Sequence, residues 1–175
     1  MKGINICTVV WGQKFLENFL NLVLPSILVE NNLPFLKNKI KWKYKLYTNI
    51  EGKNYLQEKF KKLSLNKIIE IQINTNIIEK NLNEDKYKLA NFCYSDCLEI
   101  CRSNEYGFIW IMPDQVQANN NFRNIYKYIK DKKIIFVPSF LSTDLEKMKK
   151  DLFNYKKKFQ LDIGVFELSR LTYKH

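Results

Sequence analysis

The chain has 175 residues, 46% of them hydrophobic and 14% aromatic, and a formal net charge of +11 at pH 7. This length is typical of one domain, and the apolar content excludes a disordered or low-complexity protein. The lysines are scattered over all segments, which favours a solvated surface over a stripe for specific nucleic-acid binding. A weak peripheral contact with a membrane is a second possible role for this net positive charge.

The start of the chain shows no secretory signal, because it lacks a long apolar stretch followed by a small-residue cleavage site. The most apolar run, residues 19–29, is interrupted by polar residues and by Pro25. It is also shorter than the ~20 residues that cross a bilayer. We therefore expect a cytoplasmic protein.

Strand-like apolar runs alternate with stretches of helical periodicity along the whole chain. The first half predicts a strand at 4–10, a helix at 15–28 that Pro25 kinks or restarts, a strand at 43–48, a helix at 54–63 and a strand at 67–73. The second half predicts an irregular segment at 74–83, a helix at 85–103, a strand at 108–112, a helix at 122–129, a strand at 134–137, a helix at 144–157 and a last strand at 161–166.

Helices that connect successive strands imply parallel pairing and right-handed crossovers. The expected fold is therefore a three-layer α/β domain over residues 1–175, with a mostly parallel sheet and helices on both faces. The pattern is Rossmann-like in its alternation. It shows neither an internal repeat nor a domain boundary.

The four cysteines favour a core role over a metal or redox role. Cys93, Cys97 and Cys101 are spaced four apart and share one face of the expected helix, with Cys7 on the first strand. Zinc sites usually combine closely spaced pairs with further ligands, and the only histidine is His175 at the terminus. The same helix carries Asp96 within its apolar stripe, so this carboxylate needs a buried partner and is expected to be structural.

Ligands of open α/β sheets bind outside the carboxyl ends of the strands. Here these ends fall at residues 9–12, 48–49, 74–76 and 113–117. Gly12 would let a ligand approach the backbone, and Val10 or Trp11 would pack on a base or a sugar. Ordinary turns between strands and helices would explain the same residue types.

Asp114 is the most informative residue of this set, because a carboxylate just after a buried strand is not needed for folding. It would hold a divalent cation that neutralises a diphosphate leaving group, or it is simply a turn residue. Lys88, near the start of its helix, either reaches a phosphate or is solvated. Walker, dinucleotide-binding and α/β-hydrolase motifs are absent from the sequence.

Several short segments together resemble a group of bacterial GT-A-like glycosyltransferases. They are TVVWG at 8–12, LPSIL at 24–28, NLP at 32–34, YT at 47–48 and PDQV at 113–116. The resemblance implies a GT-A-like nucleotide-diphospho-sugar transferase fold that ends before the acceptor-side structure. Its partners would be a nucleotide-diphosphate sugar and a glycan or lipid-linked acceptor of a surface polysaccharide or glycoconjugate pathway.

The resemblance also implies that Val10, Gly12 and Thr48 lie by the nucleotide. The full set of candidate substrate-binding residues is Thr8, Val10, Trp11, Gly12, Thr48, Asn49, Lys88 and Gln115. Asp114 would be catalytic and would face the diphosphate, directly or through Mg²⁺ or Mn²⁺. Residues 117–121 lack the second acidic residue expected after such a motif, so a metal would have one carboxylate only.

Three functions remain open at this point. The first is glycosyl transfer from a nucleotide sugar. The second is a catalytically inactive binding or accessory domain of the same fold. The third is a basic protein that binds nucleic acid or a membrane surface, which predicts steeply salt-dependent affinity.

Overall fold

The computed structural model describes residues 1–129 and 144–175, and the strand expected at 134–137 lies outside them. The chain divides into two compact units, each formed by two stretches of sequence. The first, here called the sheet unit, comprises Met1–Phe19 and Ile40–Pro113, and the second unit comprises Leu20–Lys39 and Asp114–His175. The alternation of strands and helices along the sequence does not indicate this division into two units.

The sheet unit is built on four parallel strands in the order β3-β2-β1-β4. The strands are β1 (Gly3–Val9), β2 (Lys41–Tyr47), β3 (Ile71–Asn74) and β4 (Tyr106–Trp110). Every residue of β1 is buried, as expected for a strand that is paired on both sides and covered on both faces. The expected α/β class and the mostly parallel sheet are therefore confirmed.

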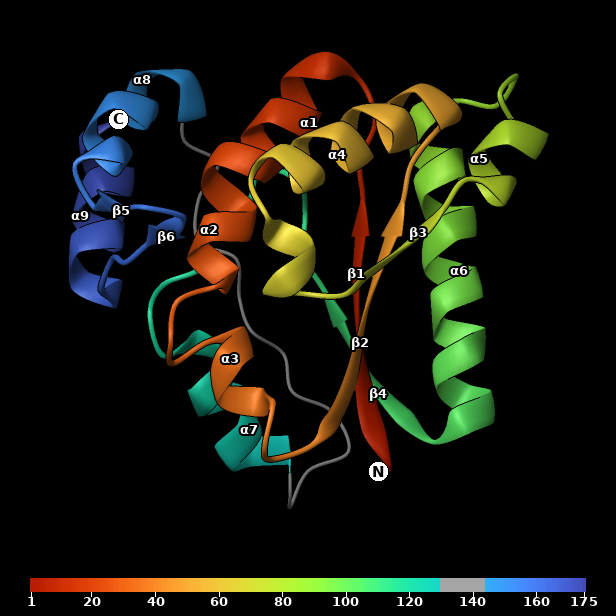
Figure 1. Cartoon of the computed structure of the whole chain (residues 1–175), viewed down its shortest axis with the longest axis horizontal. Helices are drawn as coiled ribbons and strands as arrows, with labels where there is room; N and C mark the ends of the chain where they lie inside the picture. Colours follow the sequence, from red (N-terminus) through yellow and green to blue (C-terminus); the bar gives the residue numbers. More distant parts are fainter. Residues whose placement is uncertain (130–143) are drawn as a thin grey trace. The chain divides into compact units, whose positions relative to one another are not determined.

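Four helices belong to the sheet unit: α1 (Gln13–Asn18), α4 (Ile50–Lys62), α5 (Asn76–Lys80) and α6 (Lys86–Asn104). Helices α1 and α4 lie on one side of the sheet and α6 on the other (Figure 1). The strand order steps outward from β1 to β3 and then reverses to β4, so right-handed crossovers bring α6 to the opposite face. Helix α6 packs along β1 and β4.

The stretch before α5 differs from the expectation of a strand at 67–73. The strand is confined to Ile71–Asn74, and Leu65–Lys67 instead forms a turn of 3-10 helix, η2. Ile68 is 55% exposed whereas Ile69 is buried, so the run of isoleucines is not a uniformly buried strand. Isoleucine density alone does not separate a strand from a turn that buries every other side chain.

The cysteine stripe of α6 packs against β1 and forms the core on that face. Cys7, Cys93, Cys97 and Cys101 are all free and buried, as expected for core residues. Asp96 accepts a 2.6 Å hydrogen bond from the Tyr47 hydroxyl. The expectation that Asp96 needs a structural partner is therefore confirmed.

Helix α4 begins at Ile50, four residues before the expected helix, because the side chain of the N-cap residue Asn49 accepts a hydrogen bond from the Gly52 N–H. Because Gly52 has no side chain, it also leaves space for the side chain of Thr48. A Cβ atom at Gly52 would lie 2.9 Å from Asn49 Oδ1 and closer still to Thr48 Oγ1. Thr48 is buried, so neither neighbour moves away easily.

The second unit contains α2 (Leu24–Ile27), α3 (Leu33–Leu36), α7 (Asn121–Ile129), α8 (Leu145–Phe153) and α9 (Val165–Lys174). A π-helical segment, η1 (Phe19–Val23), precedes α2, and Pro25 lies in the first turn of α2, as expected for a restarted helix. The expected strand at 161–166 is wrong. Only Gln160–Leu161 (β6) is extended, paired with Lys156–Lys157 (β5), and this hairpin also ends α8 early.

A buried polar network ties α2 to the segment before α7. Ser26 Oγ donates to the Val23 carbonyl at 2.7 Å and accepts from the Gln117 N–H at 2.9 Å. The Asn32 amide donates to the carbonyls of Ser26 and Ala118. The serine of LPSIL and the asparagine of NLP therefore have structural roles in this unit.

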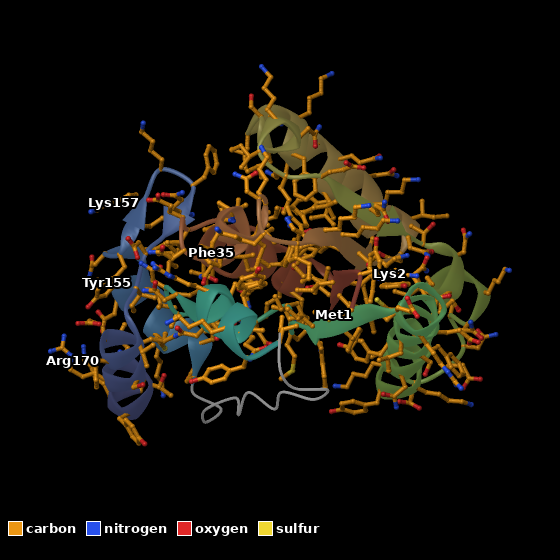
Figure 2. All side chains as sticks on the ribbon, turned by 90° about the horizontal axis from the view of Figure 1, so that it is seen from below. Met1, Lys2, Phe35, Tyr155, Lys157 and Arg170 are labelled. Carbon is orange, nitrogen blue, oxygen red and sulfur yellow. The ribbon has the colours of Figure 1, made fainter. Side chains whose placement is uncertain are left out.

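Charged side chains are spread over both units. Nitrogen-tipped side chains project from every part of the ribbon that is drawn (Figure 2). Several of these side chains form ion pairs with nearby carboxylates, such as that between Lys2 and Glu105 at 2.6 Å. Among the described residues, no helix is both long and apolar enough to cross a membrane.

Replacement of Tyr47 by Phe removes the hydrogen bond that α6 makes to β2. Because Asp96 is partly exposed and can regain water, we expect a loss of about 1–2 kcal/mol in the free energy of unfolding, measured with urea. Tyr87→Phe is the matched control, since Tyr87 is 71% exposed. Equal losses in the two variants would contradict a structural role for the Asp96 carboxylate.

Replacement of Gly52 by Ala forces a methyl group against Thr48 and Asn49. We expect a net loss of about 1–2 kcal/mol, because overpacking outweighs the helix propensity of alanine. The same change in a Thr48→Ala background removes the nearest clashing atom and is expected to cost less. Urea unfolding of the four proteins in this cycle measures the coupling, and an identical cost in both backgrounds would refute the proposed clash.

Candidate functional site

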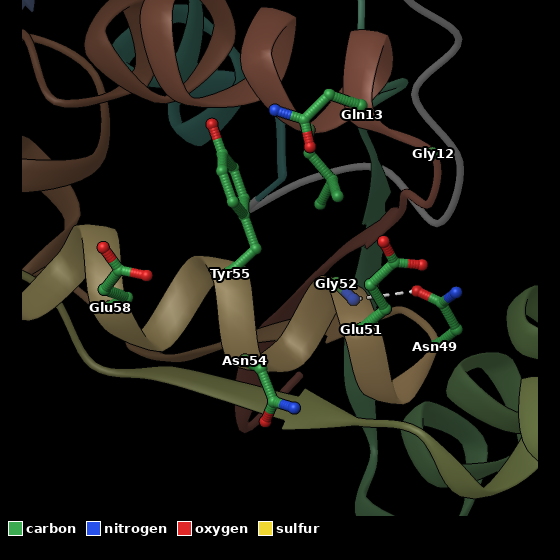
Figure 3. Close-up of a pocket in the computed structure, with 9 residues that line it drawn as sticks. Gly12, Gln13, Asn49, Glu51, Gly52, Asn54, Tyr55 and Glu58 are labelled. Carbon is green, nitrogen blue, oxygen red and sulfur yellow. Dashed lines mark hydrogen bonds between the residues drawn. The ribbon is translucent and has the colours of Figure 1, made fainter.

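The candidate site is a hollow of ≈ 260 Å³ in the sheet unit, at the carboxyl ends of β1 and β2. The first turn of α1 and the first turns of α4 form its walls (Figure 3). The residues that line it are Gly12, Gln13, Leu16, Asn49, Glu51, Gly52, Asn54, Tyr55 and Glu58. The hollow therefore lies at the end of the sheet where α/β proteins bind ligands.

Gly12 keeps one side of the hollow open. Its φ of 79° is in the region that L side chains rarely adopt, and it stands at the N-cap of α1. No neighbouring atom lies within 4 Å of the place that a Cβ would occupy. A ligand can therefore approach the backbone directly at this position.

The polar groups of the hollow come mainly from α4. Glu51 lies exposed in its first turn, and Glu58, two turns later, forms a 2.6 Å ion pair with Lys62 that holds the pKa of the Glu58 carboxyl below its usual value. On α1, the Gln13 amide donates to Glu17 at 2.6 Å. Tyr55 extends from α4 toward the helix that carries Gln13 (Figure 3).

These groups set the chemistry that the hollow accepts. None of its nine lining residues is cationic, and two are carboxylates, so the lining repels phosphate groups. Carboxylate and amide oxygens instead accept hydrogen bonds from hydroxyl and N–H donors. An aromatic ring beside them offers an apolar surface. The arrangement suits a flat or cyclic ligand that is rich in hydrogen-bond donors.

The structure brings two of the residues predicted from sequence, Gly12 and Asn49, into the hollow. Three others are buried beneath it. Thr8 is held by a 2.8 Å hydrogen bond to the Tyr44 hydroxyl, Val10 is 1% exposed, and Thr48 lies under Gly52 with no hydrogen-bond partner for its hydroxyl among the described residues.

Two further predicted residues are engaged elsewhere in the sheet unit. Trp11 is partly buried against the cysteine core on the α6 face. Lys88 forms a 2.8 Å ion pair with Glu84, which raises the pKa of its ammonium, and it lies 5.9 Å from the centre of the Phe92 ring.

Asp114 and Gln115 belong to the second unit. Asp114 is an exposed turn residue directly after Pro113, and the Gln115 carbonyl accepts a 3.2 Å hydrogen bond from the Gln117 amide. Within residues 1–129 and 144–175, no three His, Cys, Asp or Glu side chains are grouped so that they could hold a metal ion. Within these residues, a Mg²⁺ or Mn²⁺ ion at Asp114 would therefore have no preformed group of three such side chains to hold it.

Sequence reasoning missed Gln13, Glu51 and Tyr55, which supply most of the hydrogen-bonding and aromatic surface of the hollow. Each lies in the first two turns of the helix that follows a strand end. The signal was available, because the rule that selected Gly12 and Asn49 extends to the helical turns that come next.

No protein-family model, no curated protein and no solved structure matches the chain.

Proposed function

We propose that the hollow binds the nucleoside part of a nucleotide-diphosphate sugar, and that the chain is a GT-A-like glycosyltransferase. The observation that carries this proposal is the open backbone at Gly12 beside a lining of carboxylates, amides and one aromatic ring. The sequence resemblance described above supports the same reading. The acceptor would be a hydroxyl group of a glycan or of a lipid-linked sugar.

Each part of a nucleoside has a counterpart in the lining. Glu51 accepts hydrogen bonds from the two ribose hydroxyls, and the charge of the carboxylate strengthens these bonds. The Tyr55 ring packs against the base, and the amides of Gln13 and Asn54 bond to its edge. The diphosphate leaves the hollow at Gly12, away from the carboxylates, because the glycine backbone presents no side chain there.

The transfer itself would form one bond and break one. The acceptor hydroxyl oxygen attacks the anomeric carbon, and the bond from that carbon to the β-phosphate oxygen breaks with its electron pair on the leaving nucleotide diphosphate. The proton of the hydroxyl goes to a carboxylate. Asp114, exposed directly after Pro113, stays the catalytic residue that the sequence resemblance implies, in its role of facing the diphosphate.

A nucleotide-binding domain without transfer activity is the second candidate. It is favoured by the lack of a metal-binding group within the described residues, since the charge that develops on the leaving diphosphate would then have no cation to stabilise it. Both candidates share the nucleoside site and differ only in turnover.

The nucleoside site is tested by thermal denaturation and calorimetry with UDP, GDP, CDP and ADP, and with the matching nucleosides. We expect one nucleotide to stabilise the protein by about 1.4 kcal/mol when present at ten times its Kd, which raises Tm by several degrees. The corresponding nucleoside is expected to bind as well, because recognition is through base and ribose. Glu51→Gln is expected to weaken binding about tenfold.

Glu70→Gln is the matched control, since Glu70 is exposed and outside the hollow. Failure of all four nucleotides to bind would overturn the proposal. Binding that survives Glu51→Gln unchanged would place the nucleoside elsewhere. If the nucleotide binds, sugar transfer that is lost in Asp114→Asn supports the enzyme, and the absence of any turnover supports the binding domain.

A further inference from the structure

A second hollow, of ≈ 300 Å³, lies in the sheet unit beside β2 and β3. The parallel register pairs Lys45 with Gln72 and Tyr47 with Asn74, so these four side chains project from the same face of the sheet. The Tyr47 hydroxyl bonds to Asp96 of α6, which identifies the face. The residues that line this hollow are Lys45, Tyr47, Lys53, Gln72, Ile73, Asn74, Thr75 and Asn76.

The hollow exists because α6 does not fill this part of the face. The helix packs along β1 and β4, toward the other side of the sheet from β3. Strand β3 is short and at the outside of the sheet order, and the chain after it turns into α5 instead of crossing the face. Lys53, from the first turns of α4, completes the lining.

Two lysines dominate the charge of this lining. Lys45 and Lys53 are both half-buried, and neither makes an ion pair with any carboxylate within the described parts of the chain. The nearby carboxylate of Asp96 already accepts the hydrogen bond of Tyr47. Glu79, on α5, accepts a 2.7 Å hydrogen bond from the Ile50 N–H.

The remaining polar groups of the lining are neutral. They are the amides of Gln72, Asn74 and Asn76 and the hydroxyls of Thr75 and Tyr47. No lining residue is a carboxylate, so the hollow has two positive charges and a set of amide donors around them. This is the opposite of the first hollow, which has two carboxylates and no cation. A phosphate dianion fits such a lining, because its oxygens accept hydrogen bonds from ammonium and amide groups at once.

We propose that this second hollow is a ligand site that binds the phosphate group of a phosphorylated small molecule. Its volume leaves space for a substituent beside the phosphate. The site does not depend on nucleotide binding at the first hollow, since no residue lines both.

The test is a ¹H–¹⁵N NMR titration of the full chain at constant ionic strength, with inorganic phosphate in one arm and glycerol 3-phosphate in the other. Saturable shifts are expected at Lys45, Tyr47 and residues 72–76, with at least a tenfold loss of affinity in Lys45→Gln/Lys53→Gln. Saturation by glycerol 3-phosphate assigns an organic phosphate as ligand. Saturation by phosphate alone assigns the free ion, and either result supports the shared chemistry.

Lys61→Gln/Lys67→Gln is the matched control, because it removes the same charge at two exposed lysines outside the hollow. Shifts that never saturate, that gather at other residues, or that persist unchanged in Lys45→Gln/Lys53→Gln would overturn the proposal. Should that double variant fail to fold, Lys53→Gln alone decides, with a several-fold loss expected and an unchanged affinity counting against the site.

Discussion

The sheet unit depends on the burial of β1. Its seven residues are enclosed, its backbone is paired to β2 on one side and to β4 on the other, and α6 packs along it. The polar side chains of β1 also form hydrogen bonds inside the core. Asn5 donates to the Cys101 sulfur at 3.3 Å, and the Thr8 hydroxyl bonds to the Tyr44 hydroxyl. Because β1 has no free surface, only the segment after it, from Trp11 onward, is available to a ligand.

Two hollows with different linings lie beside β2. Beyond its carboxyl end, the helices α1 and α4 enclose a hollow with carboxylates and no cation. Beside β3, a second hollow has lysines and no carboxylate. The linings differ because the first hollow is formed by α1, α4 and the residues that cap them, and the second mainly by β2, β3 and the residues that follow β3. Two different ligand groups, a nucleoside and a phosphate, are therefore compatible with one small unit.

The class of fold was predictable because strands and helices differ in the period of their apolar residues, and five of the six expected strands fall in the described residues. Four of these are present at β1 to β4 within a few residues. Of the fifth, at 161–166, Leu161 ends β6, residues 162–164 have no regular structure, and Val165 and Phe166 begin helix α9. There, Val165, Leu168 and Leu171 follow helical spacing, and the two apolar residues before Gly164 were mistaken for part of the same run. The early start of α4 followed from a cap at Asn49, which the apolar pattern does not report.

The candidate site was predictable only in part. Strand ends located Gly12 and Asn49, but a pattern of residues does not state which side chains of a turn are buried, and Thr8, Val10 and Thr48 lie inside. Of the second hollow, the strand-end rule indicated only residues 74–76. Its lysines and amides come from two strands and a helix, and only the pairing register brings Lys45 beside Gln72.

Chemical modification of the buried cysteines reports the local opening of the structure between α6 and β1. Burial raises the pKa of the Cys93 thiol to about 12 and that of Cys101 to about 11, and Cys7 has its pKa raised further by its hydrogen bond to Cys97 and by burial. The thiolate is the form that attacks alkylating reagents, so at neutral pH the sulfurs of Cys7, Cys93 and Cys101 stay unreactive while α6 covers β1. The rate at which they become modified then counts how often the helix lifts from the strand.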